Sequence, residues 1–270
     1  MVDRLKRWLL GNARARTVWL WIRRVAWRTW SGRDIAKYLE THQVRKLQLG
    51  CGPNVAPGWL NCDFQPSSRD VIYVDARKPL PLPDASFDYV LAEQMIEHIP
   101  YSDSHTLLAE CFRVLKPGGR IRLITPDLDV LISLFARNPD SQAKRYTHWI
   151  WQVFHPDIEE ADPVFVLNLF SQAWGHKFLY NERTLGKALE KVGFTDLAGF
   201  RAYEIGNDGF RDVEGHKRIY KDAAEDVRAQ VAEFEAYQSF AIEAVRPTVP
   251  SAQQSTKQPA RLAAAGSLRQ

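Results

Sequence analysis

Two aspartates and a glycine-rich loop are the first residues whose types and spacing could do chemistry. The loop lies in the run LQLGCGPN, where Gly50 and Gly52 follow a short apolar stretch. Asp63 and Asp75 come at the ends of the next two apolar runs. A carboxylate can accept hydrogen bonds from both vicinal hydroxyls of a ribose, and such charged bonds are stronger than neutral ones. The glycine loop and the two aspartates together therefore predict a ligand with a ribose. The alternative is that the aspartates only begin turns.

Two common nucleotide-binding motifs do not match this loop. A dinucleotide-binding loop reads G-x-G-x-x-G, but Val55 stands where the third glycine would be. The phosphate-binding pattern G-x-x-x-x-G-K-[ST] occurs nowhere in the chain. The pattern therefore argues against a dinucleotide fingerprint and against nucleotide hydrolysis by a phosphate-binding loop.

Alternating strand and helix patterns must position these residues. Apolar positions at helical spacing predict helices over 102–115, 127–137, 181–194 and 221–238. The alternation predicts an α/β fold with a doubly wound, mostly parallel, seven-stranded Rossmann-like sheet and helices on both faces. Ligands of such sheets bind at the carboxyl ends of the strands, where the glycine loop and both aspartates would lie. The strands are predicted over 46–50, 59–64, 71–76, 87–94, 120–126, 195–205 and 239–247.

The first forty residues differ from the rest of the chain. Residues 1–40 hold 10 Lys/Arg against 3 Asp/Glu and five of the nine tryptophans, whereas residues 41–270 hold 26 against 29. Apolar residues recur at helical spacing, so we expect a basic, tryptophan-rich helical arm. It would pack on the domain or on a second subunit, or lie on anionic lipid as a peripheral membrane contact. The arm lacks the apolar length of a membrane span, and nucleic acid is not expected because the body has no further basic cluster.

The rest of the chain is expected to form one domain and a tail. Residues 41–247 would form the α/β domain, and within it 137–180 carries aromatics and histidines with poor periodicity. A stretch of this length is typical of a substrate-binding insertion or lid. Residues 248–270 form a low-complexity mix of Ser, Gln, Ala and Pro, which predicts disorder.

Composition points to an ordinary soluble protein without a metal cluster. Three dispersed cysteines indicate reduced, buried thiols and a cytoplasmic location, with the inner face of a membrane as a further site if the arm binds lipid. The acidic run HPDIEEAD has no spacing that compels a metal site, so no metal is expected. Nothing in the sequence indicates an oligomeric state.

Four strings, in this order, resemble the class I S-adenosylmethionine-dependent methyltransferases: LQLGCGPN, GWLNCD, DARKPLPLPDASFDYVLAEQMIEHI and LKPGGRIRLITPD. They cover about residues 46–130, and the later GHKFLYNERTLGKALEKVGF is also similar. The resemblance is to the small bacterial, type 11-like branch associated with glycan and natural-product assembly. It implies a methyltransferase fold with S-adenosyl-L-methionine as cofactor.

The resemblance also implies roles for single residues. The glycine loop would lie against the methionine part of the cofactor, and Asp63 would hold the ribose hydroxyls. Asp75 with its neighbour would face the adenine, and the acid and amide after the fourth strand would line the wall near the sulfonium. The implied cofactor-binding residues are Gly50, Cys51, Gly52, Asp63, Asp75, Ala76, Glu93 and Gln94.

The sequence departs from the family pattern at two places near the loop. Gln48 stands where the family usually has an acidic residue, so the contact to the amino-acid end of the cofactor would be weaker or amide-mediated. Only thirteen positions separate Gly50 from Asp63, with two prolines between them. That length is too short for the usual helix, so we expect a compact loop.

Methyl transfer from a sulfonium is an in-line displacement in which the protein mainly aligns the reactants. A hydroxyl acceptor must also lose a proton, and histidine suits that role. His98 is the first candidate, His176 the second, and Asp127 could orient the acceptor; each could instead be a capping or packing residue. We expect O-methylation of a small or glycan-linked acceptor. The alternatives are N- or C-methylation of a natural product, or a catalytically silent module that binds cofactor or partner.

Overall fold

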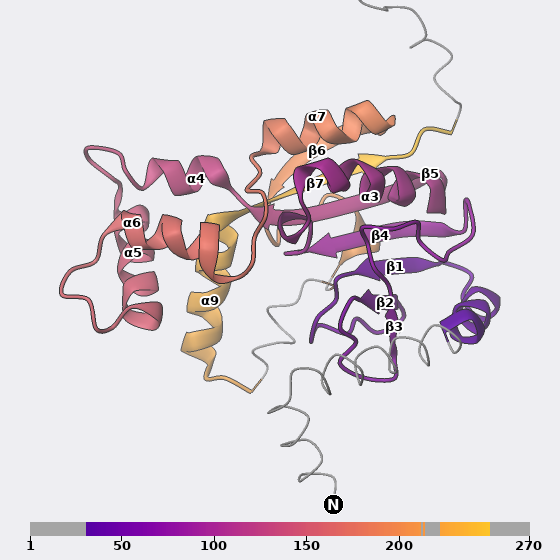
Figure 1. The fold of residues 1–270 in the computed structure, drawn as a ribbon, viewed down its shortest axis with the longest axis horizontal. Helices are drawn as coiled ribbons and strands as arrows, with labels where there is room; N and C mark the ends of the chain where they lie inside the picture. The colour runs from indigo at the N-terminus through magenta and orange to yellow at the C-terminus, as the bar shows by residue number, and fades with distance from the viewer. Residues whose placement is uncertain (1–30, 212, 214–221, 249–270) are drawn as a thin grey trace, which may run out of the picture.

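A seven-stranded sheet organises the chain, and strand order reverses at its centre (Figure 1). The computed structural model describes residues 31–211, 213 and 222–248. The order is β3-β2-β1-β4-β5-β7-β6, with β7 antiparallel to both neighbours and the other pairs parallel. The strands are β1 (Lys46–Leu49), β2 (Leu60–Asp63), β3 (Val71–Tyr73), β4 (Phe87–Glu93), β5 (Leu115–Pro126), β6 (Thr195–Arg201) and β7 (Ser239–Val245).

This arrangement confirms the predicted doubly wound, mostly parallel α/β fold. The chain leaves β1 toward β2 on one side and later returns to β4 on the other, so β1 and β4 flank the reversal. Loops that follow neighbouring parallel strands meet at one edge of the sheet, and at a reversal they leave in opposite directions. The carboxyl ends of β1 and β4 are therefore the place where this fold can hold a ligand.

Alternate side chains of each central strand enter different cores. Val90 and Ala92 belong to the main core, whereas Leu91 between them belongs to a smaller cluster on the opposite face. The main core also receives Leu107 of α3 (Tyr101–Val114) and Leu185 of α7 (Glu182–Val192), which lie side by side over the sheet in Figure 1. Near-continuous apolar runs are typical of strands buried on both faces.

α7 begins and ends where capping chemistry requires. The Asn181 side chain accepts a hydrogen bond from the backbone N–H of Thr184, which satisfies an otherwise unpaired donor of the first turn. Gly193 ends the helix in the left-handed conformation at φ +112°. The predicted helix over 181–194 is thus confirmed, one residue shorter at its start and two at its end.

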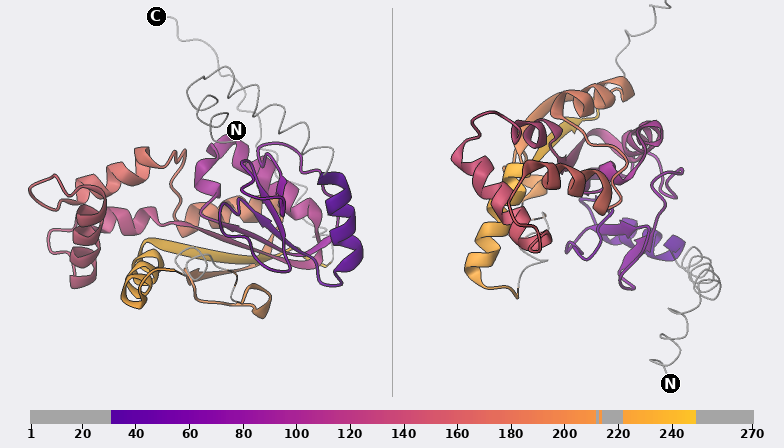
Figure 2. Two further views of the ribbon diagram at one scale, coloured as in Figure 1. Left: turned by 90° about the horizontal axis from the view of Figure 1, so that it is seen from below. Right: turned by 60° about the vertical axis from the view of Figure 1, so that its left-hand side comes forward.

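A helical lobe projects beyond the end of β5 (Figure 2). It has its own core, built around Leu131, Tyr146, Phe170 and Phe234. The predicted insertion 137–180 therefore does contain regular structure, which joins α4 and the later α9. Its elements are α4 (Leu128–Ser133), α5 (Ser141–Phe154), α6 (Pro163–Asn168), the π-helical turn η2 (Leu169–Ala173) and α9 (Glu225–Gln238).

The end of the expected N-terminal arm is part of the domain. Residues 31–41 are helical, and Ile35 and Tyr38 lie in the main core. The Tyr38 hydroxyl donates to the backbone oxygens of Lys46 and Gly58, 2.9 and 3.0 Å away. Residues 1–30 and the predicted disordered residues 249–270 lie outside the described residues. Within the described chain, no helix has the length and apolar character needed to cross a membrane.

Candidate functional site

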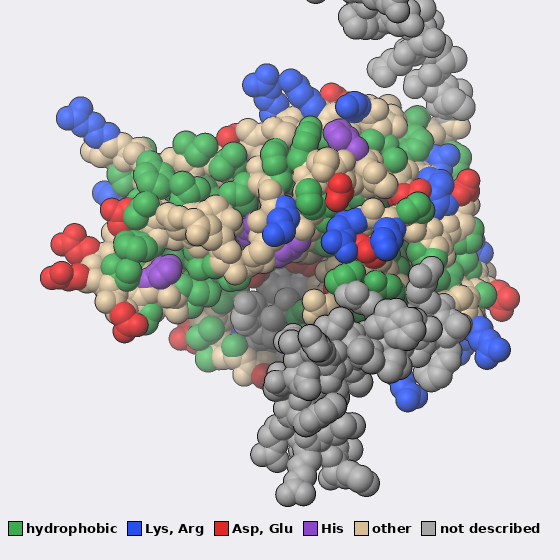
Figure 3. Space-filling view, viewed as in Figure 1, with side chains coloured by type: hydrophobic (Ala, Val, Ile, Leu, Met, Phe, Trp, Pro, Cys, Tyr) green, Lys and Arg blue, Asp and Glu red, His purple; other side chains and the backbone are tan. Residues whose placement is uncertain are grey.

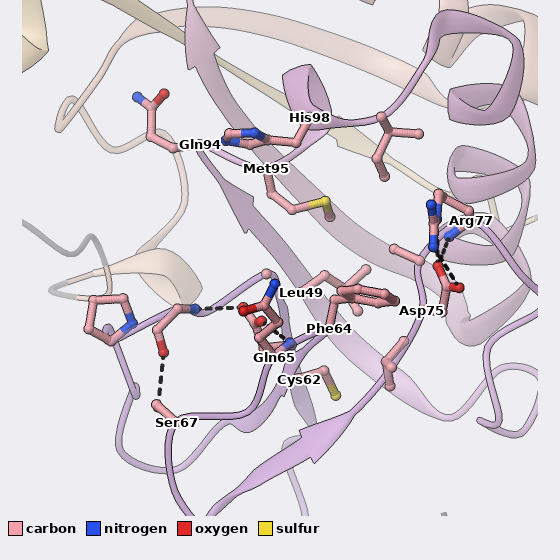
Figure 4. Close-up of a pocket in the computed structure, with 17 residues that line it drawn as sticks. Leu49, Cys62, Phe64, Gln65, Ser67, Asp75, Arg77, Gln94, Met95 and His98 are labelled. Atoms are coloured by element: carbon pink, nitrogen blue, oxygen red, sulfur yellow. Dashed lines mark hydrogen bonds and ion pairs between the residues drawn. The ribbon is translucent and has the colours of Figure 1, made fainter. Parts of the chain in front are cut away.

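A cavity of about 680 Å³ lies at the carboxyl edge of the sheet, next to the reversal between β1 and β4 (Figure 4). Its walls come from the loops after β1, β2, β3 and β4. Figure 4 shows Met95 and His98 approaching it from the side opposite to Cys62 and Ser67. The lining residues are Leu49, Gly50, Gly52, Pro53, Cys62, Asp63, Phe64, Gln65, Ser67, Val74, Asp75, Ala76, Arg77, Gln94, Met95, His98 and Ile99.

The two glycines of the loop serve different purposes. Gly50 has φ +66°, and a Cβ at this position would lie 2.2 Å from Cγ of Met95. Gly50 is therefore required by packing within the protein. Gly52 has φ +50°, and among the described residues nothing lies within 4 Å of a Cβ built there. The backbone at Gly52 thus faces open space on the cavity wall, where a ligand can approach it.

A buried asparagine holds the compact loop that follows. The Oδ1 atom of Asn61 accepts from the N–H of Ala56 at 2.9 Å. Its Nδ2 donates to the carbonyl oxygens of Ala56 and Trp59, 3.0 and 2.9 Å away. Residues 51–59 contain turns and no helix, as the short spacing between Gly50 and Asp63 predicts. One side chain on β2 thus replaces the structural support of the usual helix.

Asp63 at the end of β2 ties the glycine loop to the loop after its own strand. Its Oδ2 accepts from the N–H of Gly52 at 2.8 Å, and its Oδ1 accepts from the N–H of Gln65 at 2.6 Å. Each carboxylate oxygen can accept more than one hydrogen bond. Asp63 therefore has capacity for two ribose hydroxyls while it holds the loop.

Asp75 is engaged by an arginine. The Arg77 guanidinium donates to both carboxylate oxygens of Asp75, at 2.9 and 3.0 Å. These hydrogen bonds are the main cause that lowers the pKa of the Asp75 carboxyl. Arg77 also stacks over the Phe64 ring, 5.1 Å from its centroid. Phe64 and the Asp75–Arg77 pair thus form one end of the cavity, with an apolar face and a charged edge.

The wall after β4 has a strained residue. Gln94 takes φ +49°, which is uncommon for a residue other than glycine and occurs often at functional sites. Its Nε2 donates to Oγ of Ser239 at 3.0 Å. Glu93 lies one residue earlier and accepts from Nδ2 of Asn54 at 3.0 Å, which links β4 to the glycine loop.

His98 and His176 lie together although 78 positions separate them. Their ring centroids are 4.8 Å apart, with the planes near perpendicular. Burial lowers the pKa of both imidazoles, and in His176 the neighbouring His98 adds to the effect. Both rings are therefore biased toward the neutral form, which has a nitrogen able to accept a proton.

Asp127 has a structural task. Its Oδ1 accepts from the N–H of Asp129 at 2.9 Å and so caps α4. Burial is the main cause that raises the pKa of this carboxyl. Asp127 is absent from the lining of the cavity, and its proposed role toward an acceptor stays a prediction.

Most of the predicted site residues meet in the cavity. Gly50, Gly52, Asp63, Asp75, Ala76, Gln94 and His98 line it, whereas Cys51, Glu93, His176 and Asp127 do not. Burial raises the pKa of the Cys51 thiol to about 12, so the thiol stays protonated. Sequence reasoning missed Phe64, Ser67, Arg77 and Met95, which line the cavity as well. Phe64 directly follows a strand-end aspartate and was detectable, whereas the approach of Met95 to Gly50 depends on the three-dimensional packing.

Residues 47–123 match the family model described as "Methyltransferase domain". The match runs from β1 into β5 and includes every residue that lines the cavity. Residues 47–123 thus carry a methyltransferase domain. The family assignment predicted from the sequence is thus confirmed, and the strand order agrees with it.

The methyltransferase domain is also similar to curated proteins over part of their length. A probable S-adenosylmethionine-dependent methyltransferase of Mycolicibacterium smegmatis is 37% identical over 100 residues, which is 30% of this chain and 37% of that protein. The 27-O-demethylrifamycin SV methyltransferase of Amycolatopsis mediterranei is 47% identical over 51 residues, 19% and 18% of the two chains. The chain thus spans 37% and 18% of the length of these two relatives.

A solved structure of a SAM-dependent methyltransferase from Archaeoglobus fulgidus is also similar to this chain. The identity is 18% and the TM-score 0.45, with 84% of this chain and 94% of the other covered.

Proposed function

We propose that the protein transfers the methyl group of S-adenosyl-L-methionine to an oxygen of a small or glycan-linked acceptor. The observation that carries this proposal is the cavity in which the glycine loop and Asp63 lie on one side and His98 on another. One side suits a ribose-containing cofactor, and His98 can receive a proton from a hydroxyl.

The residues present fit this cofactor. The cavity volume of about 680 Å³ lies within the range of roughly 300–1,000 Å³ that is usual for ligand sites. Gly52 leaves its backbone accessible, and Asp63 keeps spare acceptor capacity. When bound, the cofactor supplies an activated methyl group on a sulfonium. Asp63 would hold the ribose, Phe64 would contact the base, and the Gly50–Gly52 backbone would lie along the methionine part.

The acceptor would enter beside the two histidines. His98 would take the hydroxyl proton as the oxygen attacks the methyl carbon, with His176 adjacent. Trp174 is 40% exposed, and its ring centroid lies 5.8 Å from that of His176. An exposed indole next to the reacting groups supports a glycan or aromatic acceptor, which can stack on it. The name of the Amycolatopsis mediterranei relative denotes methylation at an oxygen of a natural product, which also supports an oxygen acceptor.

We further infer a cytoplasmic enzyme with peripheral membrane contact through the basic arm. The three cysteines are buried, free thiols, which suits a reducing compartment. Co-sedimentation with anionic vesicles tests the arm, and the truncated control must start at residue 31. Removing residues 1–40 would delete Ile35 and Tyr38 from the core and confuse unfolding with lost lipid binding. Equal pelleting of full-length and truncated protein would refute the membrane contact.

Transfer of labelled methyl to an extract of small molecules and glycans tests the proposed activity. We expect product with the wild type, and a large loss with His98→Asn at unchanged affinity for S-adenosylhomocysteine. Trp174→Ala should raise KM for the acceptor while leaving cofactor affinity unchanged. Label appearing on nitrogen or carbon would refute the oxygen assignment. Cofactor binding without transfer would favour the silent-module alternative.

A further inference from the structure

Three side chains with metal-ligand chemistry converge beside the cavity. Glu97 and His98 lie on the single turn η1 (Ile96–His98) after β4, and His176 follows η2 and Gly175. One carboxylate oxygen of Glu97 and one ring nitrogen of each histidine lie within 4.8 Å of one another. His98 is also part of the cavity wall.

Glu97 is the unusual member of this cluster because it is fully buried. Its Oε2 accepts from the Thr125 hydroxyl at 3.0 Å, but within the described chain its Oε1 has no hydrogen-bond partner. Leaving a buried acceptor unpaired is costly, and a cation at this place would relieve the cost.

Both histidines are oriented by backbone carbonyls. Nδ1 of His176 lies 2.6 Å from the carbonyl oxygen of Phe170, so Nδ1 carries the proton and Nε2 is left with a lone pair. For His98, an interaction with the Gly175 backbone partly offsets the lowering of its pKa by burial. Metal-binding histidines usually donate their second ring N–H to a carbonyl or a carboxylate, which fixes the direction of the ligating nitrogen.

The backbone around the cluster is held in place from both sides. The N–H groups of Lys177 and Phe178 donate to the carbonyl oxygen of Glu97, at 2.7 and 3.2 Å. Gly175 turns the chain at φ +77° directly after the π-helical turn η2. π-helical turns such as η2 are rare and frequently mark functional sites. The segment that presents His176 is therefore fastened to the segment that presents Glu97.

We propose that Glu97, His98 and His176 form a binding site for one divalent transition-metal ion, with zinc as the best match. Two imidazoles and one carboxylate are a known set for catalytic zinc, which keeps a fourth position open. Ligand atoms on one tetrahedral zinc ion lie about 3.3 Å apart, given bonds of about 2.0–2.1 Å. The cluster would have to contract by about 1.5 Å at its widest pair, which side-chain rotation about Cβ can provide.

The role of the ion rests on the proposed function, but its binding does not. The open position would face the cavity on the side of His98 and would take the acceptor hydroxyl. With the ion bound, His98 would act as a ligand, which replaces the direct proton transfer to His98 proposed for the metal-free protein; coordination lowers the pKa of the hydroxyl, and its proton leaves to solvent water. The oxygen then forms its bond to the methyl carbon while the carbon–sulfur bond breaks and the neutral thioether departs. The ion is unchanged by the transfer.

The experiment measures metal binding alone, in the absence of cofactor and acceptor. Tag-free, full-length protein is freed of metal with a chelator and titrated calorimetrically with Zn²⁺ and, separately, Co²⁺, whose visible spectrum reports tetrahedral nitrogen and oxygen ligands. The test variants are Glu97→Gln, which keeps shape and removes charge, and His176→Asn. His148→Asn is the matched control, since His148 is an exposed histidine of α5 outside the cluster. Circular dichroism establishes that each protein is folded.

We expect one ion per chain and a metal Kd at least about tenfold weaker in both test variants. Mutation of a group that only hydrogen-bonds to a metal ligand already lowers metal affinity by about that factor, so loss of a ligand should lower it at least as much. His148→Asn should bind like the wild type. Absence of stoichiometric binding by the wild type would overturn the site. Binding that Glu97→Gln does not weaken would overturn it as well. If zinc fails to bind while S-adenosylhomocysteine binds tightly, the metal site falls and the proposed function stands.

Discussion

Replacement of Asp63 gives the sharpest test of the cofactor side. In the folded protein each carboxylate oxygen already accepts one backbone N–H, from Gly52 and from Gln65. The ribose hydroxyls would use the remaining acceptor capacity of the same two oxygens. Asp63→Ala therefore removes two kinds of interaction, those with the loops and those with the ligand. A useful experiment must separate them.

The magnitude follows from the charge on the acceptor. Hydrogen bonds to charged groups contribute roughly 1.5–3 kcal/mol, so their loss should weaken binding about ten- to a hundredfold. Loosening of the loop alone should weaken ligand affinity by a smaller factor. Ser67→Ala measures that part, because the Ser67 hydroxyl donates to the carbonyl oxygen of Gly52 at 3.2 Å and lines the same cavity without carrying charge.

Calorimetric titration with S-adenosylhomocysteine is the assay, with thermal unfolding of each variant as the control for folding. We expect tight binding by the wild type, a ten- to a hundredfold weaker Kd for Asp63→Ala by the same estimate, and about the wild-type Kd for Ser67→Ala. A folded Asp63→Ala protein that binds as tightly as the wild type would refute the ribose role. A folded wild type that does not bind would show the glycine loop to be structural only.

Three further predictions concern stability. Gly50→Ala should lower the free energy of unfolding in urea by roughly 1–3 kcal/mol, because the new Cβ meets the methionine side chain opposite; an unchanged midpoint would contradict this. The pKa of Asp75 is lowered in the folded state, so its pairing with Arg77 stabilises the fold above the ordinary aspartate pKa of about 3.9, and this stabilisation is lost as the pH falls below it. The Tm difference between wild type and Arg77→Gln should therefore shrink in acid. A difference that grows in acid would be evidence against the pairing. Arg122→Met should lower the free energy of unfolding by about 3–5 kcal/mol, because it leaves the Glu243 carboxylate buried without its ion-pair partner. In chemical denaturation the double variant with Glu243→Leu should recover most of that loss. A double variant that recovers none of it would show that the two residues are not coupled.

The sheet was predictable because its strands are short, apolar and closely followed by turn residues. The four parallel strands that build the cofactor edge, β1 to β4, lie within the predicted runs. Strand ends were less predictable where hydrogen bonds to a neighbouring strand decide them. β5 begins at Leu115 and so includes the KPGG run, residues 116–119, whereas the strand was predicted to begin at residue 120. The insertion at 137–180 was expected but its helices were not, although the buried positions of α5, Ala143, Tyr146, Thr147 and Ile150, do follow helical spacing.

The part of the cavity that is proposed to hold the cofactor was predictable as a meeting point of residues for a related reason. Glycine loops and strand-end carboxylates are local features, and the parallel sheet brings them to one edge whatever the rest of the chain does. The acceptor half depends on a contact between segments 78 positions apart, Glu97–His98 and His176. Two histidines were identified singly from their residue type, but no spacing rule joins them to a buried glutamate. Only the fold makes this cluster.

This division has a consequence for variants in the lobe. The cofactor loops are held by Asp63 and Asn61, which belong to β2, and neither contact involves the lobe. The ring of His176 instead depends on the lobe, because its Nδ1 lies 2.6 Å from the carbonyl oxygen of Phe170. A substitution that loosens the lobe core, such as Phe170→Ala, should therefore impair turnover and metal affinity while S-adenosylhomocysteine still binds. Equal loss of cofactor binding would mean that the two halves fold as one cooperative unit.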